Sequence, residues 1–158
     1  MLLALARLRA IGHEDARKDL AAVFAGYPPG GSSARGAFAQ LVKDGLVQYP
    51  SEGLARLTPA GAAAAPPVDA PASFDGLRET LERERLLNAK QLEAFDLIAK
   101  AHPDAIAKAD VAVSLDFPVG GSSIRGILAR LHALQLVSYP QEGTVRANDW
   151  IFMRGGEA

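Results

Sequence analysis

The chain of 158 residues contains no cysteine. Disulfide bonds, thiolate metal sites and a catalytic thiol are therefore excluded, and the composition fits a reducing compartment. The three histidines, His13, His102 and His132, lie in different predicted elements without the spacing of a metal site. The sequence also lacks a Gly-x-x-x-x-Gly-Lys-Ser/Thr phosphate-binding loop. We therefore expect a non-enzymatic protein with no catalytic residues, no metal site and no cofactor.

Long hydrophobic runs are missing as well. The apolar start "MLLALARLRAIG" is interrupted by Arg7 and Arg9. It is too short and too charged for a membrane span, and it lacks the small-residue cleavage pattern of a signal peptide. These features predict a cytoplasmic protein that does not bind a membrane. Hydrophobic residues make up 49% of the chain, which is enough apolar material for a core.

The chain has no large excess of charge of either sign. It carries 17 Lys and Arg against 18 Asp and Glu, a net charge of −1. Residues 1–61 sum to +2 and the remainder to −3. Dedicated nucleic-acid-binding proteins are usually more basic. Charge alone therefore argues weakly against strong DNA binding.

The chain does have a long internal repeat. The stretch "PPGGSSARGAFAQLVKDGLVQYPSEG" from Pro28 returns 90 positions later, from Pro118, as "PVGGSSIRGILARLHALQLVSYPQEG". Between residues 27–56 and 117–146, 16 of 30 positions are identical without a gap. Such a repeat predicts two structural units of the same kind.

A segment rich in proline and alanine separates the two copies. Pro66 and Pro67 are expected to end any helix in the preceding alanine run and to give a semi-extended connector. Ser73 or Asp75 can cap a following helix with a solvated Glu/Arg face. We predict a first unit at 1–61, a linker at 62–73, a connecting helix at 74–89 and a second unit at 90–158.

Each copy shows the same order of predicted elements. A first helix (2–11; 90–101) leads to a second (about 15–25; about 105–115), and a Gly-Gly turn leads to a third. The third helix starts at Ser32 or Ser122, whose hydroxyl is expected to cap its first turn. Its apolar residues recur at i, i+3, i+4 and i+7, which predicts an amphipathic helix; they are Ala34, Ala37, Phe38 and Leu41, and Ile124, Ile127, Leu128 and Leu131.

The third helix is expected to end near Gly45 or Gln135 and to lead into a β-hairpin. Two short strands flank a Pro-x-Glu-Gly turn in each copy, and Tyr49 and Tyr139 are expected to close the hairpins onto the core. Trp150, with Ile151 and Phe152, is expected to pack the C-terminal segment onto the second unit. The predicted fold is mainly α with short β-hairpins (α+β), arranged as two tandem winged helix-turn-helix units.

The first copy resembles bacterial winged helix-turn-helix domains. Those domains have a Gly/Ser-rich turn, a helix of the form Ser-x-x-Arg-x-x-Leu-x-x-Leu, a Gly-Leu-Val strand and a Leu-Thr-x-x-Gly exit, which is Leu57–Gly61 here. The second copy departs at Asp116 and Gln135, where the first has glycine, and it lacks that exit. The chain is also similar to paired winged-helix tails of bacterial P-loop ATPases. The resemblance implies a fold more than a task, since winged helices bind DNA, RNA and proteins.

The exposed face of the third helix is the candidate binding surface, because this helix enters the major groove in helix-turn-helix proteins. Arg35 and Arg125 are expected to contact guanine edges or phosphates, and the serines with free N–H groups to hold a phosphate. The candidate residues on the two helices are Ser32, Ser33, Arg35, Gly36, Gln40 and Lys43, and Ser122, Ser123, Arg125, Gly126 and Arg130. Arg56 and Arg146 on the second hairpin strand either reach the DNA backbone or pair with Glu52 and Glu142.

Gly36 and Gly126 suggest close approach by a partner. Glycine inside a helix costs about 1 kcal/mol relative to alanine, and both copies accept that cost. A sugar-phosphate strand or another helix would fit such a face. The acids at the hairpin tips, Glu52 and Glu142, would repel phosphate and favour a protein partner.

The leading functional hypothesis is a non-enzymatic module that binds double-stranded DNA through Arg35 and Arg125. The alternative is a protein–protein interaction or self-association module without direct DNA binding. A regulatory module within an ATP-driven DNA-processing machine would combine the two. Few phosphate contacts predict a modest, salt-sensitive affinity.

Overall fold

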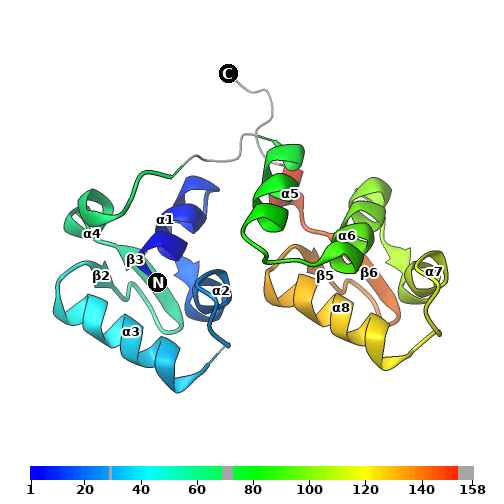
Figure 1. The fold of residues 1–158 in the computed structure, drawn as a ribbon, viewed down its shortest axis with the longest axis horizontal. Coiled ribbons are helices and arrows are strands. Elements are labelled where there is room, and N and C mark those ends of the chain that lie inside the picture. Colours follow the sequence, from blue (N-terminus) through cyan, green and yellow to red (C-terminus); the bar gives the residue numbers. More distant parts are fainter. Residues whose placement is uncertain (29, 69–72, 153–158) are drawn as a thin grey trace. The chain divides into compact units, whose positions relative to one another are not determined.

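The computed structural model describes residues 1–28, 30–68 and 73–152. Contacts divide the chain into two compact units, Met1–Pro71 (unit 1) and Ala72–Ala158 (unit 2), shown in Figure 1. The division falls at the Pro/Ala-rich segment, of which residues 69–72 lie outside the described part. The last residues predicted for the second unit, 153–158, lie outside it too.

Unit 1 combines helices with a three-stranded antiparallel sheet of order β1-β3-β2. Ala16 of β1 pairs with Ala55, and Val47 of β2 pairs with Leu57, so that β3 is the central strand. The elements in chain order are α1 (Leu2–Ala10), β1 (Ala16–Arg17), α2 (Lys18–Phe24), α3 (Ser32–Lys43), β2 (Val47–Gln48), β3 (Leu54–Leu57) and α4 (Pro59–Ala64).

Unit 2 repeats this order and its strand register 90 residues later. Its sheet has the order β4-β6-β5, with Ile106 paired with Val145 and Val137 with Ala147. The elements are α5 (Phe74–Arg83), α6 (Ala89–Ala101), β4 (Ile106–Ala107), α7 (Lys108–Ser114), α8 (Ser122–Ala133), β5 (Val137–Ser138), β6 (Thr144–Ala147) and the 3-10 helix η1 (Asp149–Phe152). The α+β class is therefore confirmed, with mostly helical units closed by short hairpins.

The second helix of each unit begins later than predicted, at Lys18 and at Lys108. The residues just before it form β1 and β4, which pair with the central strand of the sheet. In unit 1, Ala16 is fully buried by this pairing. A strand of two residues is too short to show the period-2 pattern, so neither strand could be predicted from periodicity.

The alanine run that was assigned to the linker begins with a helix, α4. Thr58 caps α4 by accepting a hydrogen bond from the Gly61 N–H at 3.0 Å, and the helix ends at Ala64, just before Pro66. Gly61 lies directly against the backbone, since a Cβ there would come within 1.9 Å of the Leu46 carbonyl oxygen. The predicted linker therefore shortens to the residues after Ala64.

The expected helix over 74–89 is shorter than predicted. Ser73 caps α5 as predicted, because its hydroxyl accepts from the Gly76 N–H at 3.1 Å. The helix ends at Arg83, and Arg85 takes a left-handed conformation with φ of 55°. Asn88 then starts α6 through a reciprocal pair of hydrogen bonds with Gln91, the capping box.

The two departures of the second copy from the glycine pattern leave its backbone unchanged. Asp116 and Gln135 adopt φ values of 60° and 56°, in the same left-handed region as Gly26 and Gly45. The carbonyl that follows α8 is also held as in unit 1: Asn148 donates to the Gln135 oxygen at 2.7 Å, as Thr58 does to the Gly45 oxygen at 2.6 Å. Both units thus keep one turn geometry with different residues.

The apolar stripes of the third helices face the cores as predicted. In α8 all four predicted residues are buried, whereas in α3 Ala34 and Phe38 are buried and the other two are half-buried. The fuller burial in unit 2 accompanies the segment after α5, where Leu86 and Leu87 are buried. The C-terminal segment packs onto unit 2 as expected, with Ile151 buried and Trp150 donating to the Gln135 oxygen at 2.7 Å.

Candidate nucleic-acid interface

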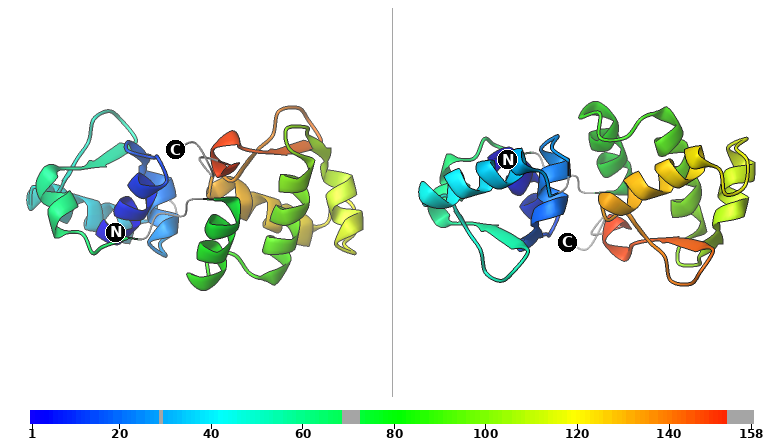
Figure 2. Two further views of the ribbon diagram at one scale, coloured as in Figure 1. Left: turned by 90° about the horizontal axis from the view of Figure 1, so that it is seen from above. Right: turned by 90° about the horizontal axis from the view of Figure 1, so that it is seen from below.

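The third helix of each unit turns one long face to solvent. The view from below in Figure 2 shows α3 running across the front of unit 1. The residues predicted to point outward from α3 are all exposed; they are Ser32, Ser33, Arg35, Gly36, Ala39, Gln40 and Lys43. In α8 the exposed residues are Ser122, Ser123, Arg125, Gly126, Ala129 and His132. Each third helix therefore packs one side against the core of its unit and exposes the opposite side to solvent.

Arg35 and Arg125 occupy equivalent positions on these faces, one turn after the helix starts. Both side chains are exposed, and neither forms a hydrogen bond or an ion pair within the described residues. Four other arginines, by contrast, have a partner in their own unit, namely Arg56, Arg78, Arg83 and Arg130. Two guanidinium groups are therefore held on rigid helices with all their donors available.

Gly36 and Gly126 lie beside these arginines on the open surface. A Cβ atom added at either position would meet nothing within 4 Å, so packing within the unit does not require glycine there. The described residues thus provide no internal reason for the glycine. An external partner that approaches the helix backbone closely would supply one.

The serine caps that the sequence suggested do not form. Gly31 and Gly121 are the N-cap residues, no side chain caps either helix, and Ser32 and Ser122 are the first helical residues. Both glycines are held in a turn by a hydrogen bond to Pro28 or Pro118, at 3.2 and 3.0 Å. The first-turn N–H groups of α3 and α8 therefore receive no side-chain cap, and the serines beside them are exposed.

Arg130 is not a free contact residue, contrary to the sequence-based prediction. Its side chain is half-buried, and its Nε donates to the Leu86 carbonyl oxygen at 3.0 Å. Burial lowers the pKa of its guanidinium from the ordinary value. Arg130 thus ties α8 to the segment after α5, whereas Gln40 at the equivalent position of α3 donates to Asp44 at 2.9 Å.

Arg56 pairs with Asp15 in place of the expected Glu52. The two side chains form a two-pronged contact in which Arg56 Nη2 lies 2.7 Å from Asp15 Oδ2. This hydrogen bonding holds the pKa of the Asp15 carboxyl below its usual range. The pair links the loop before β1 to the central strand, so Arg56 is committed within its own unit.

Arg146 has no equivalent partner, because Ala105 stands where unit 1 has Asp15. Its Nε is buried without a hydrogen-bond partner, and no ion pair joins it to Glu142 in the described part of the chain. Its charge helps to lower the pKa of Asp149, after the larger effect of a hydrogen bond from His102. His102 Nε2 lies 2.8 Å from Asp149 Oδ1, so this histidine links the end of α6 to η1.

Sequence reasoning missed a lysine in each unit that contacts the hairpin. Lys18 Nζ lies 3.4 Å from the ring centre of Tyr49, and Lys108 Nζ lies 3.8 Å from that of Tyr139. The tyrosines are 43% and 38% exposed, so the prediction that they close the hairpin onto the core was wrong. The sequence did contain a signal for this contact. Lys18 recurs at position 108 and Tyr49 recurs at position 139, and a lysine and a tyrosine that recur together suggest a cation–π pair.

These lysines lie at the start of α2 and α7, next to the hairpin turn. The Lys18 and Lys108 N–H groups donate to the Gly53 and Gly143 carbonyl oxygens at 2.9 and 2.8 Å. Glu52 and Glu142 lie beside those glycines and are exposed. Each unit therefore presents an arginine that has no partner among the described residues, a lysine positioned on a tyrosine and one acid at the tip.

Two further findings concern the described residues alone. No group of three His, Asp or Glu side chains among them is arranged to hold a metal ion. No helix among them is long and apolar enough to cross a bilayer. Neither a protein-family model, nor a curated protein, nor a solved structure matches this chain.

Proposed function

We propose that the chain is a non-enzymatic module that binds double-stranded DNA through two winged helix-turn-helix units. In this proposal α3 and α8 are the recognition helices, and the β2–β3 and β5–β6 hairpins are the wings. The order helix, strand, helix, helix, strand, strand, with the last strand central in the sheet, supports this assignment. Recognition helices of this class place their exposed N-terminal half in the major groove.

The observation that carries the proposal is the state of Arg35 and Arg125. Each projects from the exposed face of a helix whose opposite face forms the core, and neither has a partner in the described residues. Arginine in such a position can bind the guanine O6 and N7 atoms or a phosphate with two donors. The uncapped N-termini of the two helices also favour a phosphate, because their free N–H groups can donate to its oxygens.

Lys18, Lys43 and Lys108 complete the proposed contact set. Lys18 and Lys108 lie between the recognition helix and the wing, where a DNA backbone would pass, and Lys43 is exposed at the end of α3. Because Arg130 and Arg56 are used within their units, they are removed from the predicted contacts. The proposed surface of unit 1 is therefore more basic than that of unit 2.

The test is a fluorescence-anisotropy titration of a labelled random-sequence duplex at low and at physiological salt, with light scattering after size exclusion on the same sample. The proposal expects binding by a monomeric protein that weakens steeply with salt. A protein that stays unbound at low salt contradicts the proposal. This measurement needs no knowledge of the target sequence.

A protein-interaction module is the second candidate function, and a specific observation favours it. Val113 and Val119 of unit 2 are 64% and 62% exposed, and the wing tips carry Glu52 and Glu142. Exposed apolar side chains suit a protein surface better than a phosphate backbone, and acids at the wing tips would repel phosphate. A dimer or larger species in the scattering trace without DNA binding would support this candidate. A place within an ATP-driven DNA-processing machine is compatible with either function.

A further inference from the structure

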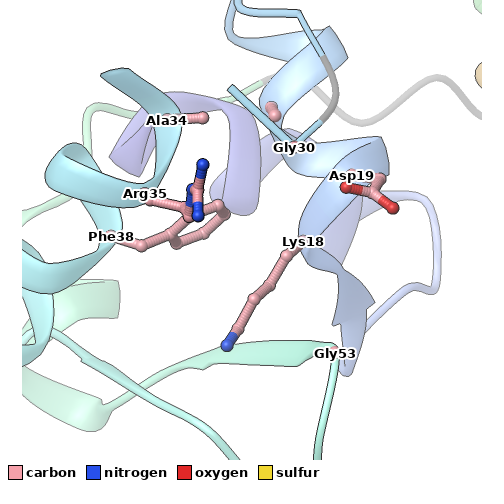
Figure 3. A pocket seen from close by; sticks show the side chains of 8 residues that line it. Lys18, Asp19, Gly30, Ala34, Arg35, Phe38 and Gly53 are labelled. Atoms are coloured by element: carbon pink, nitrogen blue, oxygen red, sulfur yellow. The ribbon is translucent and has the colours of Figure 1, made fainter. Parts of the chain in front are cut away.

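Unit 1 contains a pocket of about 270 Å³ between α2, α3 and the hairpin turn. Figure 3 shows Lys18 and Arg35 projecting from the two helices that border it. Pockets for small molecules commonly have volumes of roughly 300–1,000 Å³, so this one suits a ligand with a single ring. The lining residues that determine its chemistry are Lys18, Asp19, Ala22, Ala34, Arg35 and Phe38.

The inside of this pocket is apolar and its rim is charged. Ala22, Ala34 and Phe38 are all buried in the unit and supply the apolar wall. The charged groups are the side chains of Lys18, Asp19 and Arg35. An apolar wall with a few convergent polar groups is the usual character of a ligand site.

The pocket depends on the small side chain at position 34. The repeat places Ile124 at the same position of α8, where its side chain is buried in unit 2. The alanine side chain at position 34 has three carbons fewer than isoleucine, and this difference leaves space at the wall of the pocket. The two copies therefore differ at a residue that determines whether this space is filled.

The charges at the rim select the ligand. Arg35 has no partner in the described residues, and its planar fork fits a carboxylate with two hydrogen bonds. Lys18 adds a second positive charge that is fixed above the Tyr49 ring. Asp19 would repel a second acid, so a ligand with one negative charge complements the rim best.

We propose that this pocket binds a small aromatic monocarboxylate, with its ring against Ala34 and Phe38 and its carboxylate on Arg35. On the basis of the proposed function, which assigns Arg35 to DNA, the ligand and DNA compete for this side chain. The pocket is then the place where a metabolite with a carboxylate releases unit 1 from DNA.

The direct test uses benzoate as the probe and follows backbone amide chemical shifts of the full chain by NMR. A ligand of this size is expected to bind with a dissociation constant of about 1 mM, with saturable shifts at the pocket residues. Benzyl alcohol and benzylamine, which lack the negative charge, are expected to bind at least about tenfold more weakly. Tighter binding of benzylamine would assign the pocket to a cation held by Asp19 and overturn the proposal, as would the absence of saturable shifts at the pocket.

Two substitutions locate the binding. Ala34→Ile fills the pocket and is expected to abolish the benzoate shifts while leaving the DNA affinity measured without benzoate unchanged. Arg35→Gln changes only an exposed side chain and is expected to weaken benzoate binding about tenfold, so it decides the matter if Ala34→Ile impairs folding. The matched control is Arg125→Gln in unit 2, which is expected to leave benzoate binding unaltered. Equal benzoate binding by the wild type and Arg35→Gln overturns the proposal.

The competition is measured separately, as the loss of anisotropy of a bound duplex when benzoate is added at constant ionic strength. Displacement that disappears in Ala34→Ile supports the regulatory step. Shifts at the pocket together with unchanged DNA binding would overturn the competition and leave the ligand site in place. Absence of DNA binding in the wild type contradicts the proposed function and not the pocket, because the shifts are recorded without DNA.

Discussion

Replacing Arg35 and Arg125 together by alanine should lower the DNA affinity and also make this affinity less dependent on the salt concentration. Five cations form the proposed surface, three of them exposed and two half-buried, and each phosphate contact contributes about 0.9 to the slope of log K against log salt. The wild type should therefore show a slope of about −4.5, and the double variant about −2.7. The five cations are Lys18, Arg35, Lys43, Lys108 and Arg125.

The loss of affinity follows from the same counting. At about 0.1 M salt, release of the counterion at one phosphate contributes a factor of about 8, so two lost contacts lower the affinity about 60-fold. The assay is the anisotropy titration repeated at several salt concentrations on a random-sequence duplex. The secondary structure of the variant should be unchanged, because both side chains are exposed and unpaired in the described residues.

The matched control removes two positive charges elsewhere. Arg83 and Lys90 are exposed side chains outside α3 and α8 and form ion pairs with Glu84 and Glu93. Replacing both by alanine changes the net charge equally but should leave the slope unaltered. Equal slopes for the wild type and the Arg35/Arg125 variant would refute the assignment of these arginines. An equal loss in the control would show that net charge alone determines the binding.

Three further substitutions test the local structure. Gly36→Ala should stabilise unit 1 by about 1 kcal/mol in urea unfolding, because alanine favours the helix and its Cβ meets no atom within 4 Å. The same change should weaken DNA binding if the backbone is approached closely, and unaltered binding would remove that role from the glycine. Gly61→Ala should destabilise unit 1 by about 2 kcal/mol, since its Cβ would come within 1.9 Å of the Leu46 oxygen; a neutral effect would contradict the described packing. Arg56→Gln should return the Asp15 pKa toward its ordinary value. The Asp15 pKa is lowered in the folded state, so the pair's contribution is present above about pH 4 and is lost as pH falls. Unfolding midpoints of the variant should thus depend less on pH below about pH 4, and an unchanged acid dependence would count against the pair.

The repeat and its helical pattern could be predicted from the sequence because they are local properties. The apolar residues of 122–133 recur with the period of a helix, and all four predicted positions are buried. The exposed positions of Arg35 and Arg125 follow from the same period, since the side of a helix opposite its apolar stripe faces solvent. Both candidate contact residues were therefore recognisable without the structure.

Partners from distant parts of the chain could not be predicted in this way. Asp15 and Arg56 are separated by 41 positions, and Arg130 finds the Leu86 carbonyl 44 positions earlier. Neither pair has a sequence signature, because their meeting depends on how the elements pack. The expected partners, such as Glu52 for Arg56, were chosen only because they were close in sequence.

By itself, the sequence determined that this protein has two copies of one α+β unit, where their amphipathic helices lie and which two arginines they expose. Periodicity and turn residues act over a few positions and need no tertiary context. The tertiary structure alone decided which charged groups remain available. In the described part of the chain, Arg56 and Arg130 have partners within their own units and Arg35 and Arg125 have none, while Lys18 lies beside a pocket that Ala34 keeps open. These outcomes depend on distances between residues far apart in the chain, which only packing establishes.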